Sequence, residues 1–79
     1  MIIDSSALLA VLLDEPERGA FVAAMLDEPC RMSAAALAEA GIVADQRSTA
    51  LGRALDRLVE EFGIEVVPLT AQQALAARR

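Results

Sequence analysis

Apolar residues in this chain fall into short runs and helical repeats, separated by polar or proline-containing breaks. Two isoleucines, Ile2 and Ile3, lead to a single acid at Asp4, and residues 7–13 then form an uninterrupted apolar stretch. This pattern predicts a very short strand at Ile2-Ile3. It also predicts a helix over residues 7–13 that is apolar on every side and is capped by Ser5 or Ser6.

The middle of the chain predicts three further helices. A helix over residues 16–27 begins with a proline, which suits a first helical turn. Ser33 is the predicted N-cap of a helix over residues 34–47, and Ser48 or Thr49 opens the next one. Helical spacing in that fourth helix is clear from its apolar positions, which are Leu51, Leu55, Leu58, Val59 and Phe62.

Strand-like segments lie between the helices. Residues 31–32 form a weak strand candidate, and residues 64–67 form a second one that ends at Pro68. Thr70 and Gln73 have capping-box spacing, which predicts a fifth helix starting at Thr70. Strands that alternate with helices predict the α/β class, with a short parallel sheet of about three strands flanked by about five helices.

The end of the sequence carries no stop signal for that fifth helix. The residues after Thr70 are strong helix formers and end in Arg78-Arg79, without the Gly, Asn or Pro that usually terminates a helix. One interpretation is a final helix whose two arginines favour the helix dipole. We favour the other, in which the chain stops in the middle of a fold.

Composition limits the classes of function. The formal net charge is −5 at pH 7, which argues against a general nucleic-acid-binding module but is compatible with a metal-dependent nuclease, whose active site is itself acidic. A lone Cys30 and the absence of histidine exclude an internal disulfide and make a zinc site very improbable. No signal peptide or membrane span is recognised, so a soluble, cytoplasmic protein is expected.

Asp4 is the first candidate for chemistry. An acid at the carboxyl end of a buried parallel strand lies where open α/β sheets bind their ligands. The other interpretation is structural, because Asp is a good N-cap. Since Ser5 and Ser6 offer two capping hydroxyls already, a third capping group would be redundant, and the position alone leaves both roles open.

Glu39 is the second candidate. It is the only charged residue between Arg31 and Asp45, within a stretch of small apolar residues that suggests a buried helix. A lone buried carboxylate is costly unless it is paired or bound to a cation; the simpler interpretation is that it points outward. Two carboxylates that converge from Asp4 and Glu39 would suit Mg²⁺ or Mn²⁺. A third acid, Glu65, alternates with the apolar residues of a predicted strand and is therefore expected on the solvent side.

Four segments, taken in order, resemble the PIN-domain toxins of the VapC type. They are residues 1–10 with the hydrophobic-Asp-Ser-Ser-Ala signature, residues 14–17 (Asp-Glu-Pro-Glu), residues 32–35 leading to Glu39, and residues 63–70. The resemblance implies a PIN-like fold and a metal-dependent endoribonuclease that is the toxin of a type II toxin–antitoxin pair. Its implied partners are RNA, a cognate antitoxin and a second copy of itself, in a homo-oligomer such as a dimer.

By the same resemblance, Asp4 is the first acid of the family's metal site and Glu39 the second, and both would bind Mg²⁺ or Mn²⁺. Ser6 matches the hydroxyl position near the metal, so the implied catalytic set is Asp4, Glu39 and Ser6. Family members supply further acids from their second half, and no residue here matches them. Residues 1–79 are therefore expected to be the N-terminal portion of a single PIN domain, with weak or no activity alone.

Two other classes of function remain open from the sequence. A non-catalytic binding module would use apolar first and fourth helices left exposed (Leu9, Leu12, Leu13; Leu51, Leu55, Leu58) to associate with an antitoxin or another PIN chain. A small helical adaptor without chemistry would hold Asp4 and Glu39 too far apart to share one ion.

Overall fold

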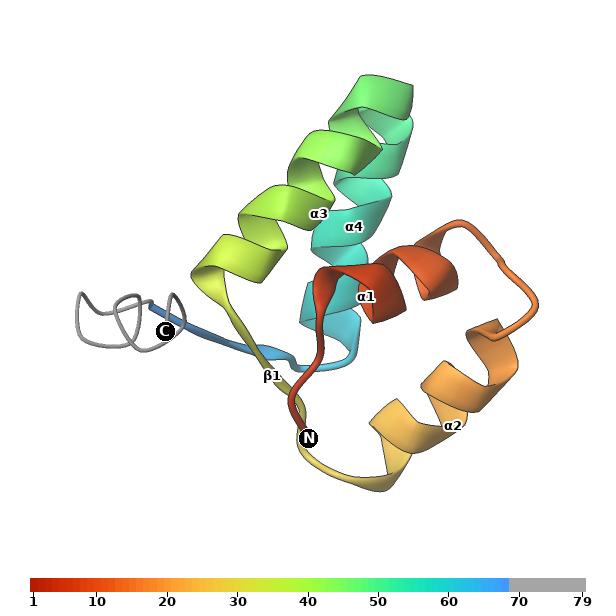
Figure 1. Cartoon of the computed structure of the whole chain (residues 1–79), viewed down its shortest axis with the longest axis vertical. Coiled ribbons are helices and arrows are strands. Elements are labelled where there is room, and N and C mark those ends of the chain that lie inside the picture. Colours follow the sequence, from red (N-terminus) through yellow and green to blue (C-terminus); the bar gives the residue numbers. More distant parts are fainter. Residues whose placement is uncertain (69–79) are drawn as a thin grey trace, which may run out of the picture.

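The computed structural model describes residues 1–68 and contains four helices and two strands in that range. The elements follow the order α1 (Ser5–Leu12), α2 (Arg18–Asp27), β1 (Arg31–Ser33), α3 (Ala34–Arg47), α4 (Thr49–Glu61) and β2 (Glu65–Val67) (Figure 1). The predicted α/β class with a short parallel sheet is confirmed. The fifth helix predicted from Thr70 lies outside the described residues.

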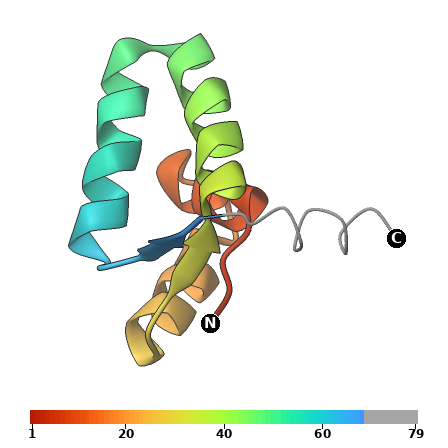
Figure 2. The ribbon, with the colours of Figure 1, turned by 90° about the vertical axis from the view of Figure 1, so that its left-hand side faces the viewer.

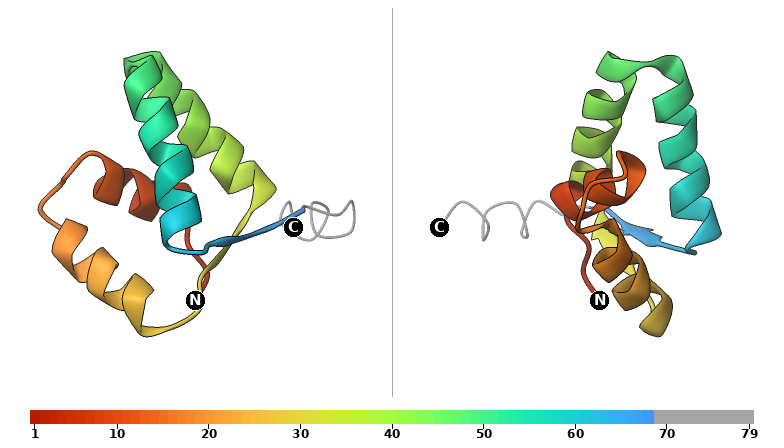
Figure 3. Two further views of the ribbon diagram at one scale, coloured as in Figure 1. Left: turned by 180° about the vertical axis from the view of Figure 1, so that it is seen from behind. Right: turned by 90° about the vertical axis from the view of Figure 1, so that its right-hand side faces the viewer.

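The sheet consists of β1 and β2 in parallel, with Met32 opposite Val66. The N-terminal segment runs along the other side of β1 (Figure 3), but it forms only an isolated parallel bridge between Ile2 and Arg31. The Ile3 N–H donates to the Arg31 carbonyl at 2.8 Å, and the Arg31 N–H donates to the Met1 carbonyl at 2.9 Å. Within the described residues, the strand predicted at Ile2-Ile3 is therefore shortened to one bridge.

Helix α1 lies between α2 and the pair formed by α3 and α4 (Figure 1). Leu8 is fully buried, and Ala10 and Val11 are nearly so. The expectation that α1 and α4 expose their leucines is wrong: Leu55 is only 2% exposed, and the other leucines named for that surface are half-buried, most of them against the core. The three neighbouring helices cover α1, so little of its apolar surface remains for a partner.

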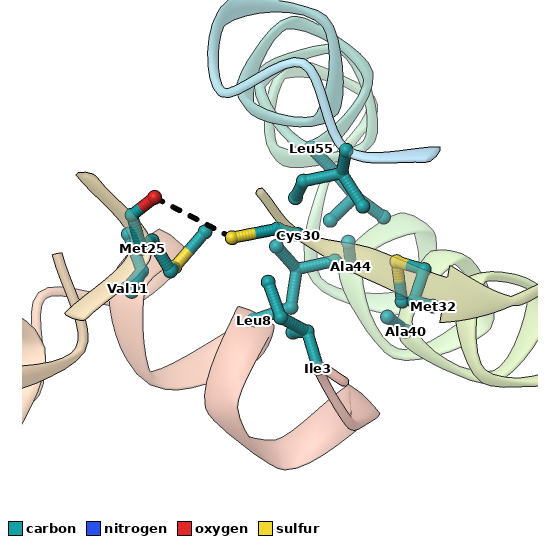
Figure 4. Close-up of a cluster of buried hydrophobic side chains, with 10 residues drawn as sticks. Ile3, Leu8, Val11, Met25, Cys30, Met32, Ala40, Ala44 and Leu55 are labelled. Carbon is teal, nitrogen blue, oxygen red and sulfur yellow. Dashed lines mark hydrogen bonds between the residues drawn. The ribbon is translucent and has the colours of Figure 1, made fainter. Parts of the chain in front are cut away.

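The antiparallel helices α3 and α4 stand side by side above the sheet (Figure 2). Their inner faces join α1 and β1 in one aliphatic core, which includes Leu8, Met32, Ala40 and Leu55 (Figure 4). Small residues on α3 allow the helices to approach closely, and the long side chains fill the space between them. Cys30 lies in the same core, where its thiol donates weakly to the Met25 carbonyl at 3.4 Å.

Serine caps define the starts of α3 and α4. Ser33 Oγ accepts from the Ala36 N–H and Ser48 Oγ accepts from the Leu51 N–H, each at 3.0 Å. The predicted cap at Ser33 is confirmed, and of the two residues predicted for the next helix, Ser48 is the cap. Helix α2 begins at Arg18, two residues later than predicted. The preceding residues form a turn instead, in which Asp14 has a positive φ of 54°. Within residues 1–68, no helix is long and apolar enough to cross a membrane.

Two glycines, Gly63 after α4 and Gly19 in α2, offer a stability test. Gly63 has a φ of +60°, whereas Gly19 lies in α2 with ordinary helical geometry, and neither has an atom near the position of an added Cβ. We expect Gly63→Ala to lower the free energy of unfolding by about 1 kcal/mol, because alanine is strained at positive φ. Gly19→Ala should instead raise it by about 0.5 kcal/mol. Urea denaturation of both variants tests the opposite signs.

Candidate metal-binding site

Asp4 is the N-cap of α1. Its backbone is extended (φ −95°, ψ 170°), and its Oδ1 accepts from the Ala7 N–H at 2.8 Å. The Ser6 hydroxyl donates to the same oxygen at 3.0 Å. The prediction that Ser5 or Ser6 caps this helix is wrong: both serines belong to the first helical turn, and the aspartate one residue earlier has the extended backbone that a cap requires.

Both hydrogen bonds to Asp4 fall on Oδ1. Within residues 1–68, no hydrogen bond or ion pair engages Oδ2, and the residue is exposed. The carboxylate is thus held by one oxygen and presents the other to solvent. Capping and ligand binding, which looked like competing roles in the sequence, are compatible in this geometry.

The pKa of Asp4 is lowered from its ordinary value of 3.8. The largest cause is the hydrogen bond from the Ala7 backbone, followed by the one from the Ser6 hydroxyl, because both stabilise the charged carboxylate. Asp4 is therefore ionised throughout the neutral range. A carboxylate must be deprotonated to bind a cation, so Asp4 is in the required state.

This lowered pKa predicts a pH dependence of stability. A depressed folded-state pKa means that the charged carboxylate stabilises the fold above pH 3.8, and that this stabilisation is lost as the pH falls through the folded-state pKa. Asn at position 4 can accept the same capping bond but cannot titrate. We expect the stability of the parent chain to fall more steeply than that of Asp4→Asn below pH 4, as measured by chemical denaturation. Parallel curves for the two proteins would contradict this assignment.

Glu39 is exposed in the second turn of α3, so the expectation that it is buried is wrong. The buried face of α3 consists of Ala40 and Ala44, while Ala38 and Glu39 lie in solvent. An exposed carboxylate needs no compensating cation. Burial therefore no longer supports a metal role for Glu39, and only its place in the fold and the family resemblance do.

Topology brings Asp4 and Glu39 toward the same edge of the sheet. Asp4 directly follows the segment that pairs with β1, α3 begins where β1 ends, and α1 packs against α3. Ser6 is joined to Asp4 by its hydrogen bond, but Glu39 has no hydrogen bond or ion pair to either residue. Among residues 1–68, no three acidic, histidine or cysteine side chains gather closely enough to hold a metal ion.

Sequence reasoning missed two features beside Asp4. One is the Ala7 backbone N–H, which the spacing from an Asp cap to the third helical residue could have indicated. The other is a hollow of about 190 Å³ next to the carboxylate. Its lining is mostly apolar and comes from the N-terminal segment, α1 and α2: Met1, Ile2, Ile3, Asp4, Ala7, Phe21 and Met25.

The residues present are compatible with a hard divalent cation. Mg²⁺ is commonly bound through one or two carboxylates with several retained waters. Asp4 offers an ionised, exposed oxygen without a protein partner in the described range, and Glu39 could supply a second carboxylate. No histidine is present in the sequence, which leaves oxygen ligands as the natural donor set.

Comparison with known proteins finds similarity to several ribonucleases. Ribonuclease VapC28 of Mycobacterium tuberculosis is 45% identical over 80 aligned residues, which cover 99% of this chain and 60% of that protein. Ribonuclease VapC of Mycolicibacterium smegmatis is 41% identical over an alignment that covers 99% of this chain and 62% of that protein. Ribonuclease VapC30 of M. tuberculosis is 40% identical over an alignment that covers 99% of this chain and 61% of that protein.

The chain thus spans about three-fifths of the length of these relatives. The family model for the PIN domain matches residues 1–79, the whole of the sequence. The match includes the Asp4 cap, the α3 segment that carries Glu39 and both strands of the sheet. This chain belongs to the PIN-domain family.

Proposed function

We propose that this chain contributes the first part of the active site of a metal-dependent endoribonuclease, the toxin of a type II toxin–antitoxin pair. The observation that carries the proposal is the carboxylate of Asp4, which is ionised, fixed through Oδ1 and, among residues 1–68, without a partner at Oδ2. Similarity to proteins named VapC ribonucleases supplies the reaction class. We also propose a cytoplasmic location, as the reaction on RNA requires access to transcripts.

In this proposal, Asp4 and Glu39 hold Mg²⁺ or Mn²⁺. Such an ion, when bound, supplies an activated water and stabilises negative charge on the phosphodiester. Asp4 would hold the ion through the oxygen that is not engaged by the fold, and the two hydrogen bonds to Oδ1 would restrict rotation of the carboxylate. Glu39, exposed on α3, would add a second oxygen. No side chain is required as a nucleophile.

Two carboxylates make an incomplete site for this reaction. The relatives are longer than this chain, and the family resemblance implies further acids in their second half. We therefore propose that the 79-residue chain alone cleaves RNA weakly or not at all. The missing acids would come from additional polypeptide or from another copy of the protein, in a homo-oligomer.

The direct test is RNA cleavage by the purified chain with Mg²⁺, Mn²⁺ or EDTA. We expect background cleavage by the chain alone. We expect metal-dependent cleavage by a fusion that adds to residue 79 the part of Ribonuclease VapC28 beyond the match. Efficient cleavage by a monomer of the chain alone, abolished by Asp4→Ala, would overturn the incomplete-site proposal. RNA cleavage by the fusion that persists in EDTA would overturn the proposed chemistry.

A binding module is the second candidate, and the edge of the N-terminal segment favours it. Met1 and Ile3 direct their backbone bonds to β1, so the N–H and carbonyl of Ile2 point away from the sheet, and its side chain is 76% exposed. Open strand edges pair readily with other polypeptides. We propose that an antitoxin or another PIN chain associates here. A monodisperse monomer by light scattering, unchanged by a VapC-type antitoxin, would contradict this candidate.

A further inference from the structure

The amino group of Met1 is bound to the loop that leads into β1. The Met1 ammonium donates a hydrogen bond to the Pro29 carbonyl at 2.7 Å and lies 3.5 Å from Glu28 Oε1, within ion-pair distance. Hydrogen bonds from a charged donor are shorter and stronger than those between neutral groups. Met1, Glu28 and Pro29 thus form a contact that we call the N-terminal anchor.

The N-terminal anchor lies at one end of residues 1–3, and Asp4 follows at the other end. In the described structure, two backbone hydrogen bonds attach these residues to β1, from the Ile3 N–H to the Arg31 carbonyl and from the Arg31 N–H to the Met1 carbonyl. A short segment with so few contacts opens easily. The ammonium therefore supplies a substantial share of the interactions that hold the residues before Asp4 on the sheet.

We infer that the Met1 ammonium is a positioning group for Asp4 and a modification site, and that its acylation releases residues 1–3 from β1 and weakens cation binding. The effect on the cation rests on the metal site proposed above, whereas the attachment to β1 is independent of that site. Acylation by an anhydride or thioester joins the Met1 nitrogen to the acyl carbon, as the nitrogen loses a proton and the carboxylate or thiol leaves. The product is uncharged, so it cannot pair with Glu28.

The direction of the expected effect distinguishes position from charge. Removal of a positive charge near Asp4 would by itself favour cation binding. Three residues of extended chain separate the two groups by about 10 Å, roughly one Debye length, so this direct electrostatic effect is small. Weaker cation binding after acylation would therefore report the loss of a fixed position for Asp4.

The sequence makes the amine accessible to a clean experiment. It contains no lysine, so the α-amino group is its only primary amine, and amine reagents modify a single position. Acetylation removes the positive charge. Reductive dimethylation with formaldehyde and cyanoborohydride is the matched control, because the product keeps the positive charge and one N–H donor.

The experiment compares the 79-residue chain with its acetylated and dimethylated forms. After acetylation, hydrogen exchange of the Ile3 amide should be about tenfold faster, in line with the loss of a hydrogen bond to a charged group. The Glu65 amide, which donates to the Cys30 carbonyl on the other side of β1, should exchange as before. Mn²⁺ binding, measured by loss of the free-ion electron paramagnetic resonance signal, should weaken about tenfold. The dimethylated chain should behave as the parent does in both measurements.

The two measurements separate failure of this inference from failure of the proposed site. Unchanged exchange of the Ile3 amide after acetylation would overturn the N-terminal anchor, and equal effects of acetylation and dimethylation would overturn the role of the charge. Faster exchange with parent-like Mn²⁺ binding would overturn the link to Asp4 and leave the metal site standing. No Mn²⁺ binding by the parent chain would overturn the metal site and that link, while the exchange rates would still decide whether the ammonium holds residues 1–3 on β1.

Discussion

Asp4→Asn is expected to abolish metal-dependent RNA cleavage while leaving the fold intact. Asparagine keeps an oxygen that can accept from the Ala7 N–H, and Asn and Asp are about equally good N-caps. It lacks the negative charge and replaces the second carboxylate oxygen with an NH2 group, which cannot bind a cation. Cleavage assays on the VapC28 fusion described above, with Mg²⁺ present, measure the first effect. Urea denaturation of the chain measures the second.

Asp4→Ala is the companion variant, because it removes both roles at once. We expect the same loss of cleavage, together with a decrease of about 1 kcal/mol in the free energy of unfolding from loss of the cap. The comparison therefore separates the two functions of one side chain. If the asparagine variant kept full metal-dependent activity, Asp4 would be a structural cap and nothing more.

Leu8→Ala is expected to cause the largest loss of stability among the variants considered. Leu8 is 0% exposed at the centre of α1, the helix that contacts α2, α3 and α4. Truncation of a fully buried leucine costs about 2–5 kcal/mol through lost burial and the cavity left behind. Small domains are commonly stable by only about 5–10 kcal/mol, so the variant should lose a large fraction of its stability. Urea denaturation followed by circular dichroism measures the change.

Leu26→Ala provides the matched control for this substitution. Leu26 is 73% exposed on α2, so the identical chemical change removes little buried surface. We expect its free energy of unfolding to stay within about 0.5 kcal/mol of the parent value. Comparable losses in the two variants would show that α1 is not the centre of the core.

The sequence predicts α3 and α4 well for a local reason. Ser33 is the predicted cap of α3, and the predicted start of α4 was narrowed to Ser48 or Thr49, so the first residue of each helix is fixed to within one position. The start of α1 is ambiguous because Asp4, Ser5 and Ser6 can all serve as caps. Backbone conformation decides among them, and it depends on the pairing of the preceding residues with β1.

Burial was harder to predict than secondary structure. The alanines around Glu39 suggested a buried helix, but alanine is tolerated on either face, and the structure places Ala38 and Glu39 in solvent. The apolar character of α1 suggested exposed surface, whereas tertiary packing against the other helices buries Leu8 completely. Both errors arise because the assignment of helix faces depends on neighbours that are distant in the sequence.

Prediction of the candidate site depended on Asp4, for which the sequence allowed two roles, a helix cap and a metal ligand. Asp4 was recognised as a candidate ligand from its place after the N-terminal segment, and that placement is what the structure shows. The division between Oδ1 and Oδ2 could not be predicted, because it depends on side-chain geometry in the first turn of α1. The hollow beside Asp4 could not be predicted from the sequence either, since Phe21 and Met25, which help to line it, belong to the separate helix α2.

The most direct test of the account is residue-specific line broadening by Mn²⁺ in amide NMR spectra of the chain and of Asp4→Asn. If Asp4 holds the cation, the Ala7 amide beside its carboxylate should be among the first to broaden as Mn²⁺ is added. In Asp4→Asn, the Ala7 signal should persist at the same concentrations. Equal broadening of Ala7 in both proteins would contradict the claim that Asp4 is a metal ligand.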